Sequence, residues 1–577
     1  MNKILKSLLL ICTAVFSYGI FVGCSDDNNS GMSRLFRPVL SNSNIKSGLD
    51  DNKVPYLEFK WDAYSDADKY IATLVPSDGS NPISVETNEP TCKFTNLAYD
   101  MEYQIRLKAI STSKGIESKE YTTTVTTADY PTMLNSLSSS NIIDTEARIT
   151  WDVDGGNTVY DVLKIYNGDD ELIDEIQLTA DDLAAGEVII RNLEPAKSYR
   201  VDAYYDGKYL GKKRFKTAAS ESYSGAVVDL RVFTASELKK MLSTEFLDSV
   251  VTAHAEEDIN IVLKGGIEYT ISGGTTIPAT THTIRFVTGL TLEGNARFIS
   301  GGGFTIGKNG ADVESIVYEK IDFISDKAKA MDDLKANTDK GWGGRQVFNI
   351  NGVSSILNNL TFKDCTVTGY RAVVRGQTNK DHIHNVTLEN CTINGIGDQG
   401  VLTNADKGGD WKVVTIKNCT FTNIVMLCDF RKTANPLEMN VENCTFCYAP
   451  LETTANANTP LFRFAGNSVA LKVKNTLFGP SMASEESSGG TIMPYVAGTA
   501  GNIMINATAT TLDIISCYKT NFIYTDLRTE EEPKTYPLEG VEDLKMSETE
   551  LWSNPANGNF KIIANLDATD VGDLRWK

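Results

Sequence analysis

Four copies of one eight-residue pattern recur in the second half of the chain, and each carries a cysteine at its sixth position. The copies follow one another at steps of 26, 28 and 25 residues, counted between Cys365, Cys391, Cys419 and Cys444. Apolar and polar side chains alternate within each copy as in a half-buried β-strand. Weaker copies at residues 316–323 and 471–478 extend the array. This period is typical of a parallel β-helix, so we expect a right-handed one over residues 227–577.

Equivalent residues of such coils form ladders, because neighbouring strands lie about 4.8 Å apart. The position before each cysteine holds an acid or an amide. The equivalent position of the weaker copy at 471–478, which has no cysteine, also holds an amide. These five residues are Asp364, Asn390, Asn418, Asn443 and Asn475. These side chains bond exposed backbone at turns. We therefore expect this ladder to stabilise a turn, with the cysteines stacked behind it as small buried groups.

The cysteines allow two interpretations. Besides Cys12 and Cys24 there are eight, and an even number in an exported chain suggests disulfides. Ladder side chains run parallel, however, whereas a disulfide needs Cβ atoms aimed at each other. We favour stacked free thiols. Cys444 and Cys447 spell a C-x-x-C motif, but it sits on a strand and not at a helix start, so no redox role is expected.

The residues two positions before the cysteine alternate in sign down the coils: Glu319, Lys363, Glu389, Lys417, Glu442 and Lys474. Opposite charges on adjacent strands stabilise a sheet by roughly 0.2–1 kcal/mol per pair. We expect a self-neutralised, solvated structural stripe on this face.

A second strand in each coil carries the candidate binding residues. With Val374, Leu402, Phe430 and Phe462 pointing inward, one outward column would contain Arg375, Thr403, Arg431 and Arg463. A column of like charges is not explained by stability, and arginine suits bidentate binding of carboxylates. Two interpretations stay open. Either the column holds an anionic ligand, or Asp429 and nearby loop acids neutralise it.

Metal ligands are sparse. His382 and His384 share a face of an extended segment and suit a metal, but no third ligand stands beside them in the sequence. Asp398, Asp406 and Asp410 are scattered, without the spacing of a Ca²⁺ site. We predict no metal site and treat these acids as solvated loop residues.

The N-terminus predicts export. An apolar run over residues 8–22 follows two lysines and is shorter than the roughly 20 residues of a membrane span, so residues 1–23 are expected to be a signal peptide. Cys24 after a small residue resembles a bacterial lipoprotein cleavage site, and residues 25–27 resemble the surface-export signal of Bacteroides-type lipoproteins. The resemblance implies a lipid on Cys24, an outer-membrane lipoprotein exposed at the cell surface, and membrane contact through the lipid alone. Residues 24–51 are expected to be a flexible linker.

Two stretches before the β-helix share landmarks. Residues 52–128 contain Trp61 on an early strand and Tyr103 opening a later one, and residues 129–218 repeat the pattern with Trp151 and Tyr199 after Leu193. Both resemble fibronectin type III domains, in which the tyrosine forms a corner. Tandem sandwiches of this kind are usually spacers. The chain is thus expected to be all-β: two fibronectin type III-like β-sandwiches followed by the β-helix.

Charge excludes one class of partner. The chain has 55 basic and 75 acidic side chains, for a formal charge of −20. Sequence-independent binding of nucleic acid needs lysine and arginine to replace counterions, so we expect no nucleic-acid partner.

The whole arrangement resembles the polysaccharide-utilisation lipoproteins of Bacteroides-type bacteria. Residues 227–577 look like the pectate-lyase superfamily, and the closing residues 551–560 and 572–576 are similar to the tails of such proteins. The resemblance implies binding or cleavage of acidic polysaccharides such as pectin. Lyases of that family use an arginine or lysine base, and many use Ca²⁺. Here no compact acidic cluster matches the family's Ca²⁺ ligands, and no Lys–Arg pair can be assigned as base and acid.

We therefore expect a cell-surface lipoprotein that binds a uronate-containing polysaccharide without a cofactor. The candidate ligand-binding residues are Arg375, Thr403, Asp429, Arg431 and Arg463. The alternative is a polysaccharide lyase that cleaves a polyuronate by β-elimination, with Arg375 or Arg431 as the base; for this alternative the use of Ca²⁺ as a cofactor stays open. A third hypothesis is an adhesin or structural stalk.

Overall fold

The protein is mostly β structure, with 53% of residues in strands and 8% in helices, which confirms the predicted fold class. The computed structural model describes residues 34–577 except 154–159, 240, 272, 308–309, 329–344, 352–353, 378–380, 405–408, 432, 434–436, 453–460, 465–468, 481, 484–501, 505–510, 522–534, 538–539 and 567–569. The predicted signal peptide and Cys24 lie outside these residues. No helix within the described part of the chain is long and apolar enough to cross a membrane.

The chain divides into two compact units, and the division runs through the second sandwich. One unit holds Met1–Ser136, Thr150–Val188 and Tyr199–Phe215, and the other holds Leu137–Ile149, Ile189–Ser198 and Lys216–Lys577. The domain boundaries drawn from the sequence stay predictions.

The first sandwich contains two antiparallel sheets. One has the order β1 (Ile45–Leu49), β2 (Pro55–Lys60) and β5 (Thr91–Phe94), and the other the order β4 (Ile83–Thr87), β3 (Lys69–Pro76), β6 (Glu102–Ser111) and β7 (Ile116–Glu117), with β8 (Tyr121–Thr126) beside β6. Alternate residues of β2, β3 and β6 are buried. Trp61 packs edge-on against Tyr70, with ring centroids 5.2 Å apart. The Tyr103 hydroxyl accepts a hydrogen bond from the Ala98 amide, which is the expected tyrosine corner.

The second sandwich contains a four-stranded and a two-stranded sheet. Their orders are β11 (Leu172–Gln177), β10 (Val162–Asn167), β13 (Ser198–Tyr205), β14 (Lys208–Lys216), and β12 (Glu187–Ile190), β9 (Ala147–Thr150). A short helix that the sequence analysis did not predict, α1 (Ala180–Ala185), begins after a capping box between Thr179 and Asp182.

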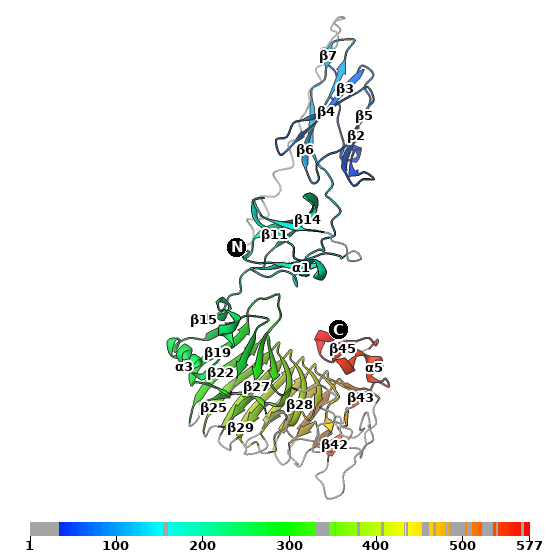
Figure 1. Ribbon diagram of the computed structural model, residues 1–577. Helices are drawn as coiled ribbons and strands as arrows, with labels where there is room; N and C mark the ends of the chain where they lie inside the picture. Colours follow the sequence, from blue (N-terminus) through cyan, green and yellow to red (C-terminus); the bar gives the residue numbers. More distant parts are fainter. Residues whose placement is uncertain are drawn as a thin grey trace, which may run out of the picture. The chain divides into compact units, whose positions relative to one another are not determined.

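The C-terminal part is a parallel β-solenoid of about seven turns, which confirms the predicted β-helix (Figure 1). The right hand of its coil stays a prediction. One sheet has ten strands: β15 (Ala226–Asp229), β16 (Ile259–Leu263), β19 (Thr280–Thr288), β22 (Asp312–Glu319), β25 (Ile356–Lys363), β27 (Asp381–Glu389), β29 (Gly409–Lys417), β32 (Leu437–Glu442), β36 (Val469–Lys474) and β40 (Thr511–Ile515).

The other long sheet is parallel except where β42 pairs with β39. Its strands are β17 (Glu268–Ile271), β18 (Thr275–Ile277), β20 (Ala296–Ser300), β21 (Phe304–Ile306), β23 (Ile321–Ser325), β24 (Gln346–Ile350), β26 (Thr366–Gly376), β28 (Thr392–Thr403), β30 (Thr420–Ile424), β31 (Cys428–Asp429), β33 (Thr445–Cys447), β35 (Phe462–Arg463), β37 (Leu477–Phe478), β39 (Asn502–Met504), β41 (Cys517–Lys519), β42 (Thr535–Pro537) and β43 (Val541–Asp543). Aromatic side chains stack inside the coil at the rung spacing, as Phe421 and Phe446 do with centroids 4.8 Å apart.

Before the first coils lie two short helices. They are α2 (Ala235–Leu238) and α3 (Thr244–Ala253). The N-cap of α2 is Thr234, and its amide donates to the Glu237 carboxylate at 2.8 Å.

The predicted acid-and-amide ladder forms the turn between the two long sheets. All five of its residues adopt a left-handed backbone with φ between 50° and 54°: Asp364, Asn390, Asn418, Asn443 and Asn475. Asparagine and aspartate tolerate this conformation better than other side-chain-bearing residues. The amides also bond one another, because Asn390 Nδ2 donates to Asp364 Oδ1 at 2.9 Å and Asn418 Nδ2 to Asn390 Oδ1 at 2.6 Å.

The cysteines behind this ladder are buried free thiols, as expected. Cys517 adds a further rung to the cysteine ladder. It follows Ser516, whose φ of 50° matches the left-handed residues before the other ladder cysteines. This rung was not predicted from the sequence. Each ladder thiol donates to the carbonyl two residues earlier, as Cys517 Sγ does to Ile515 O at 3.3 Å. Burial raises the pKa of the Cys517 thiol to about 11. Cys444 and Cys447 of the C-x-x-C motif are both fully buried and form no disulfide.

The charged stripe has the predicted register. Its six residues are direct neighbours on successive strands, in the order Glu319, Lys363, Glu389, Lys417, Glu442, Lys474. Lys474 Nζ lies 3.3 Å from Glu442 Oε1, and Lys363 Nζ lies 3.6 Å from Glu319 Oε1. The stripe therefore neutralises itself.

The C-terminal segment lies across the acid-and-amide ladder. It contains α5 (Glu548–Leu551), the antiparallel pair β44 (Trp552–Asn554) and β45 (Asn559–Ile562), and the 3-10 turn η5 (Leu574–Trp576). Arg575 donates to the carbonyls of Asn390 and Cys391 at 2.6 and 2.9 Å, and Trp576 Nε1 donates to Thr420 Oγ1 at 2.7 Å. This segment therefore joins two neighbouring turns of the coil.

Candidate functional site

The outward column that was predicted from the sequence lies on the sheet that contains β26, β28, β31 and β35, and it differs from the prediction at one position. The register pairs Arg375 with Thr403, Thr403 with Asp429, and Asp429 with Arg463. Asp429 thus takes the place that we predicted for Arg431, and Cys428 takes the inward place predicted for Phe430. Asn349 extends the column beyond Arg375 and was not identified from the sequence.

The cause is a bulge in β28. Tyr370 pairs with Ile396, but Ala372 pairs with Gly400, so β28 holds two residues more than β26 over the same span. The bulge places Asp398 against Arg371, with Nε–Oδ1 and Nη2–Oδ2 distances of 2.6 and 2.9 Å. The next coil has no such insertion. In that coil Asp429, ten positions after Cys419, therefore enters the column. Arg375 does the same in its own coil, ten positions after Cys365.

Asp429 is the centre of an ion-pair cluster. Arg431 donates to it from Nε and Nη2 at 2.8 Å each, and Arg463 Nη1 lies 3.4 Å from Oδ2. The Asp429 side chain is only 4% exposed, whereas that of Arg431 is 44% exposed. Burial lowers the pKa of Arg463, and Asp429 opposes that shift. The neutralising role considered for Asp429 is therefore present in the structure.

The strip brings several guanidinium groups close together. The column residues and Arg431 together contain three guanidinium groups, including that of half-buried Arg375, and one carboxylate. Thr403 is buried between Arg375 and Asp429 and contributes little exposed surface. The five predicted residues thus come together as one continuous strip, with Arg431 beside the column.

A second cluster lies on the other long sheet. Asp410 is the direct neighbour of His382 on the next coil, and a ligand atom from each of His382, His384 and Asp410 lies within 4.8 Å of the other two. Among the described residues, this is the one group of three that is able to hold a metal ion. Asp410 was not identified from the sequence as a partner of the two histidines. The signal was present, because Asp410 follows His382 by 28 residues, the step between Cys391 and Cys419.

The proposed loop acids do not gather into a Ca²⁺ site among the described residues. Asp398 is engaged by Arg371, Asp410 faces the histidines, and Asp406 lies outside the described residues. The expectation that they are solvated loop acids is wrong for Asp398 and Asp410, which lie on β28 and β29 and face Arg371 and the histidines.

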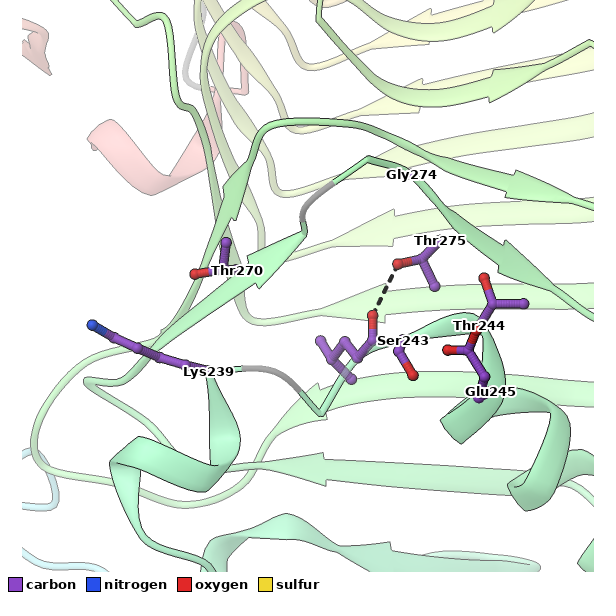
Figure 2. A pocket seen from close by; sticks show the side chains of 8 residues that line it. Lys239, Ser243, Thr244, Glu245, Thr270, Gly274 and Thr275 are labelled. Atoms are coloured by element: carbon purple, nitrogen blue, oxygen red, sulfur yellow. Dashed lines mark hydrogen bonds between the residues drawn. The ribbon is translucent and has the colours of Figure 1, made fainter.

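A pocket of about 530 Å³ lies near the start of α3, away in sequence from every predicted site residue. Lys239 and Thr270 stand on one side of it, and Ser243, Thr244 and Glu245 on the other (Figure 2). Thr275 Oγ1 closes part of the wall by donating to Leu242 O at 2.9 Å. The lining holds one ammonium and one carboxylate and no cluster of catalytic groups.

No family model and no curated protein matches the chain. Among solved structures, it is similar to the FN1–FN3 domains of chicken CNTN1, at 16% identity and a TM-score of 0.13, over 32% of this chain and 68% of that one. It is also similar to a two-domain fibronectin type III segment of chicken tenascin, at 16% identity and a TM-score of 0.16, over 32% of this chain and 99% of that one. With scores this low, the architecture rests on the strand order and register above.

Proposed function

We propose that the chain is a cell-surface lipoprotein that binds an acidic, uronate-containing polysaccharide along the strip formed by Arg375, Thr403, Asp429, Arg431 and Arg463. The observation that carries the proposal is the gathering of three guanidinium groups on one strip of a protein of formal charge −20. Arginine binds carboxylates in a bidentate manner. Three such groups along one strip favour a ligand with several carboxylates.

The spacing of the strip supports a polymer over a single sugar. Arg375 and Arg463 stand three coils apart, a distance of about 14 Å at the usual spacing between strands. A ligand that contacts both ends must extend along the coil axis. A chain of uronate residues presents carboxylates over such a length, whereas a monosaccharide does not.

Retention on a polygalacturonate affinity gel tests the proposal. We expect the purified protein to be retained and the double variant Arg375→Ala, Arg431→Ala to elute with the unbound fraction. Arg297→Ala is the matched control, since Arg297 lies on the same solenoid in an exposed pair with Glu268. Unchanged retention of the double variant would remove the strip from the proposal.

A polysaccharide lyase is the second candidate function. It is favoured by the lowered pKa of Arg463, because an arginine base must lose a proton before it removes one from the substrate. The base proposed from the sequence was Arg375 or Arg431, whereas this shift falls on Arg463. Incubation with polygalacturonate and ultraviolet detection of unsaturated products separates the two functions. Steady product formation that is lost in Arg463→Lys supports the lyase, and retention without product supports binding alone.

We also propose that Cys24 carries the lipid that anchors the protein in the outer membrane. The lipoprotein-like sequence around Cys24 supports this location. Labelling of cells with a fatty-acid analogue should mark the wild-type chain and leave Cys24→Ala unlabelled. Protease treatment of intact cells should digest the protein if it faces the outside.

A further inference from the structure

We propose that His382, His384 and Asp410 form a binding site for a divalent transition-metal ion, with Zn²⁺ as its representative. His382 Nδ1 lies 3.7 Å and His384 Nε2 lies 4.0 Å from Asp410 Oδ2. Nothing in this proposal depends on polysaccharide binding. The site lies on the ten-stranded sheet, whereas the cationic strip lies on the other long sheet.

The β-helix itself brings the three residues together. His382 and His384 are two apart on β27, so both point away from the core, while Ile383 between them is fully buried. Asp410 stands beside His382 on β29. Because the strands are in register, the third ligand belongs to the scaffold and not to a free loop.

A neighbouring amide fixes the protonation of His384. Asn358 Nδ2 donates to the carboxylates of Asp312 and Glu314 at 3.3 and 3.1 Å, so its Oδ1 must be the atom that faces His384 Nδ1 at 2.8 Å. An acceptor there requires a proton on Nδ1. In the neutral ring the lone pair is then on Nε2, the nitrogen that faces Asp410. Metal-binding histidines are held in this way by their second nitrogen.

His382 provides the second nitrogen donor. Its Nδ1 is a buried atom without a hydrogen-bond partner among the described residues, although the ring as a whole is one-third exposed. Asp410 Oδ2 lies 3.7 Å from this nitrogen, which is too far for a hydrogen bond. A cation between these atoms would give His382 Nδ1 the partner that it lacks, and the exposed side of the ring leaves room for water or a ligand as a further donor.

The donor set selects the class of metal. Two imidazoles and one carboxylate suit Zn²⁺ and its neighbours, whereas Ca²⁺ and Mg²⁺ prefer oxygen ligands alone. Tetrahedral Zn²⁺ with bonds near 2.0–2.1 Å places its ligand atoms about 3.3 Å apart. The two separations from Asp410 Oδ2 are 3.7 and 4.0 Å and all three lie within 4.8 Å, so the side chains must move closer together when the ion binds.

Calorimetric titration of the full mature protein with Zn²⁺ tests the proposal. We expect one equivalent to bind, and Co²⁺ to give the visible absorption of a four-coordinate ion. His384→Ala and Asp410→Asn should each weaken binding at least tenfold. The matched control is His282→Ala, because His282 also stands near a carboxylate, that of Asp258 at 3.9 Å, and should leave binding unchanged. Absence of saturable binding, or equal binding by His384→Ala, overturns the site.

Asn358 offers an independent test, because it acts through His384. Asn358→Ala should weaken Zn²⁺ binding about tenfold and shift the Co²⁺ spectrum, and Asn358→Asp, which restores an acceptor, should recover both. Asn359→Ala is the control: Asn359 also donates to Glu314 but accepts from Asn385 and not from His384. Equal effects of the two alanine variants would contradict the role of Asn358. Circular dichroism of each variant confirms that the fold is intact.

Discussion

Arg431 is bound to Asp429, two residues before it in the chain, through Nε–Oδ1 and Nη2–Oδ2 hydrogen bonds of 2.8 Å each. The carboxylate also faces Arg463 and is almost completely buried. One buried acid therefore positions two guanidinium groups of the proposed binding strip.

Removal of that acid should cost stability as well as binding. Asp429→Ala removes the carboxylate from beside the guanidinium group of Arg463, whose side chain is only 19% exposed. We expect the free energy of unfolding to fall by about 3 kcal/mol, as for other buried pairs that lose one partner. Denaturant unfolding measures this. Asp513→Ala is the control, since Asp513 is 57% exposed and pairs with Lys472 at 3.8 Å; it should cost less than about 0.5 kcal/mol. Equal losses in the two variants would contradict a structural role of Asp429.

Alkaline pH should destabilise the β-helix through its buried thiols. The pKa of Cys517 rises from 9.0 to about 11 on burial. The unfolded chain therefore loses this proton first as the pH rises, and stability present below about pH 9 declines between pH 9 and 11. Cys517→Thr should flatten this decline, because Thr476 already fills the equivalent position and bonds Lys474 O in the same way. An unchanged slope in denaturant unfolding at each pH would refute the explanation.

Replacement of a residue of the acid-and-amide ladder by glycine should cost less stability than replacement by alanine. Asn418 has φ 54° and bonds both Asn390 and the Leu574 amide. Asn418→Ala loses these bonds and places an alanine in the left-handed region, so we expect a loss of about 2–3 kcal/mol; Asn418→Gly keeps the conformation without strain and should lose about 1 kcal/mol. Midpoints of denaturant unfolding report the difference. A glycine variant no more stable than the alanine variant would show that backbone conformation is unimportant here.

The C-terminal segment should protect the turns that it covers. Arg575→Ala removes the bonds to the Asn390 and Cys391 carbonyls. We expect faster amide hydrogen exchange in residues 390–392 and 418–420, because local opening of these turns no longer has to break the bonds of Arg575 and therefore costs less free energy. Exchange in the first sandwich serves as the internal reference. Identical exchange in both proteins would mean that the segment adds no local stability.

Much of the fold was accessible from the sequence because a solenoid repeats its constraints. The cysteine period, the acid-and-amide ladder and the alternating stripe from Glu319 to Lys474 each recur at every coil, so errors at one coil are corrected by the next. The left-handed backbone of Asn390 and its equivalents follows from the same positions.

The candidate site was less accessible because it depends on a single irregularity. The two extra residues of β28 near Asp398 lengthen that coil alone, so carrying the count from Cys391 to Thr403 over to the next coil places Arg431 where Asp429 stands. No periodic signal reports such a bulge. The pairing of His382 with Asp410 was available from the 28-residue step, but only once the coil had been recognised on both sheets.

The central proposal is recognition of carboxylates on a polysaccharide, and calorimetry with two forms of one polymer tests it most directly. Polygalacturonate carries a carboxylate on each sugar, and its fully methyl-esterified form carries none. We predict saturable binding of polygalacturonate and at least tenfold weaker binding of the ester, with an affinity for the acid form that falls as salt is added. Equal binding of the two polymers, or no binding of polygalacturonate, would contradict the proposal.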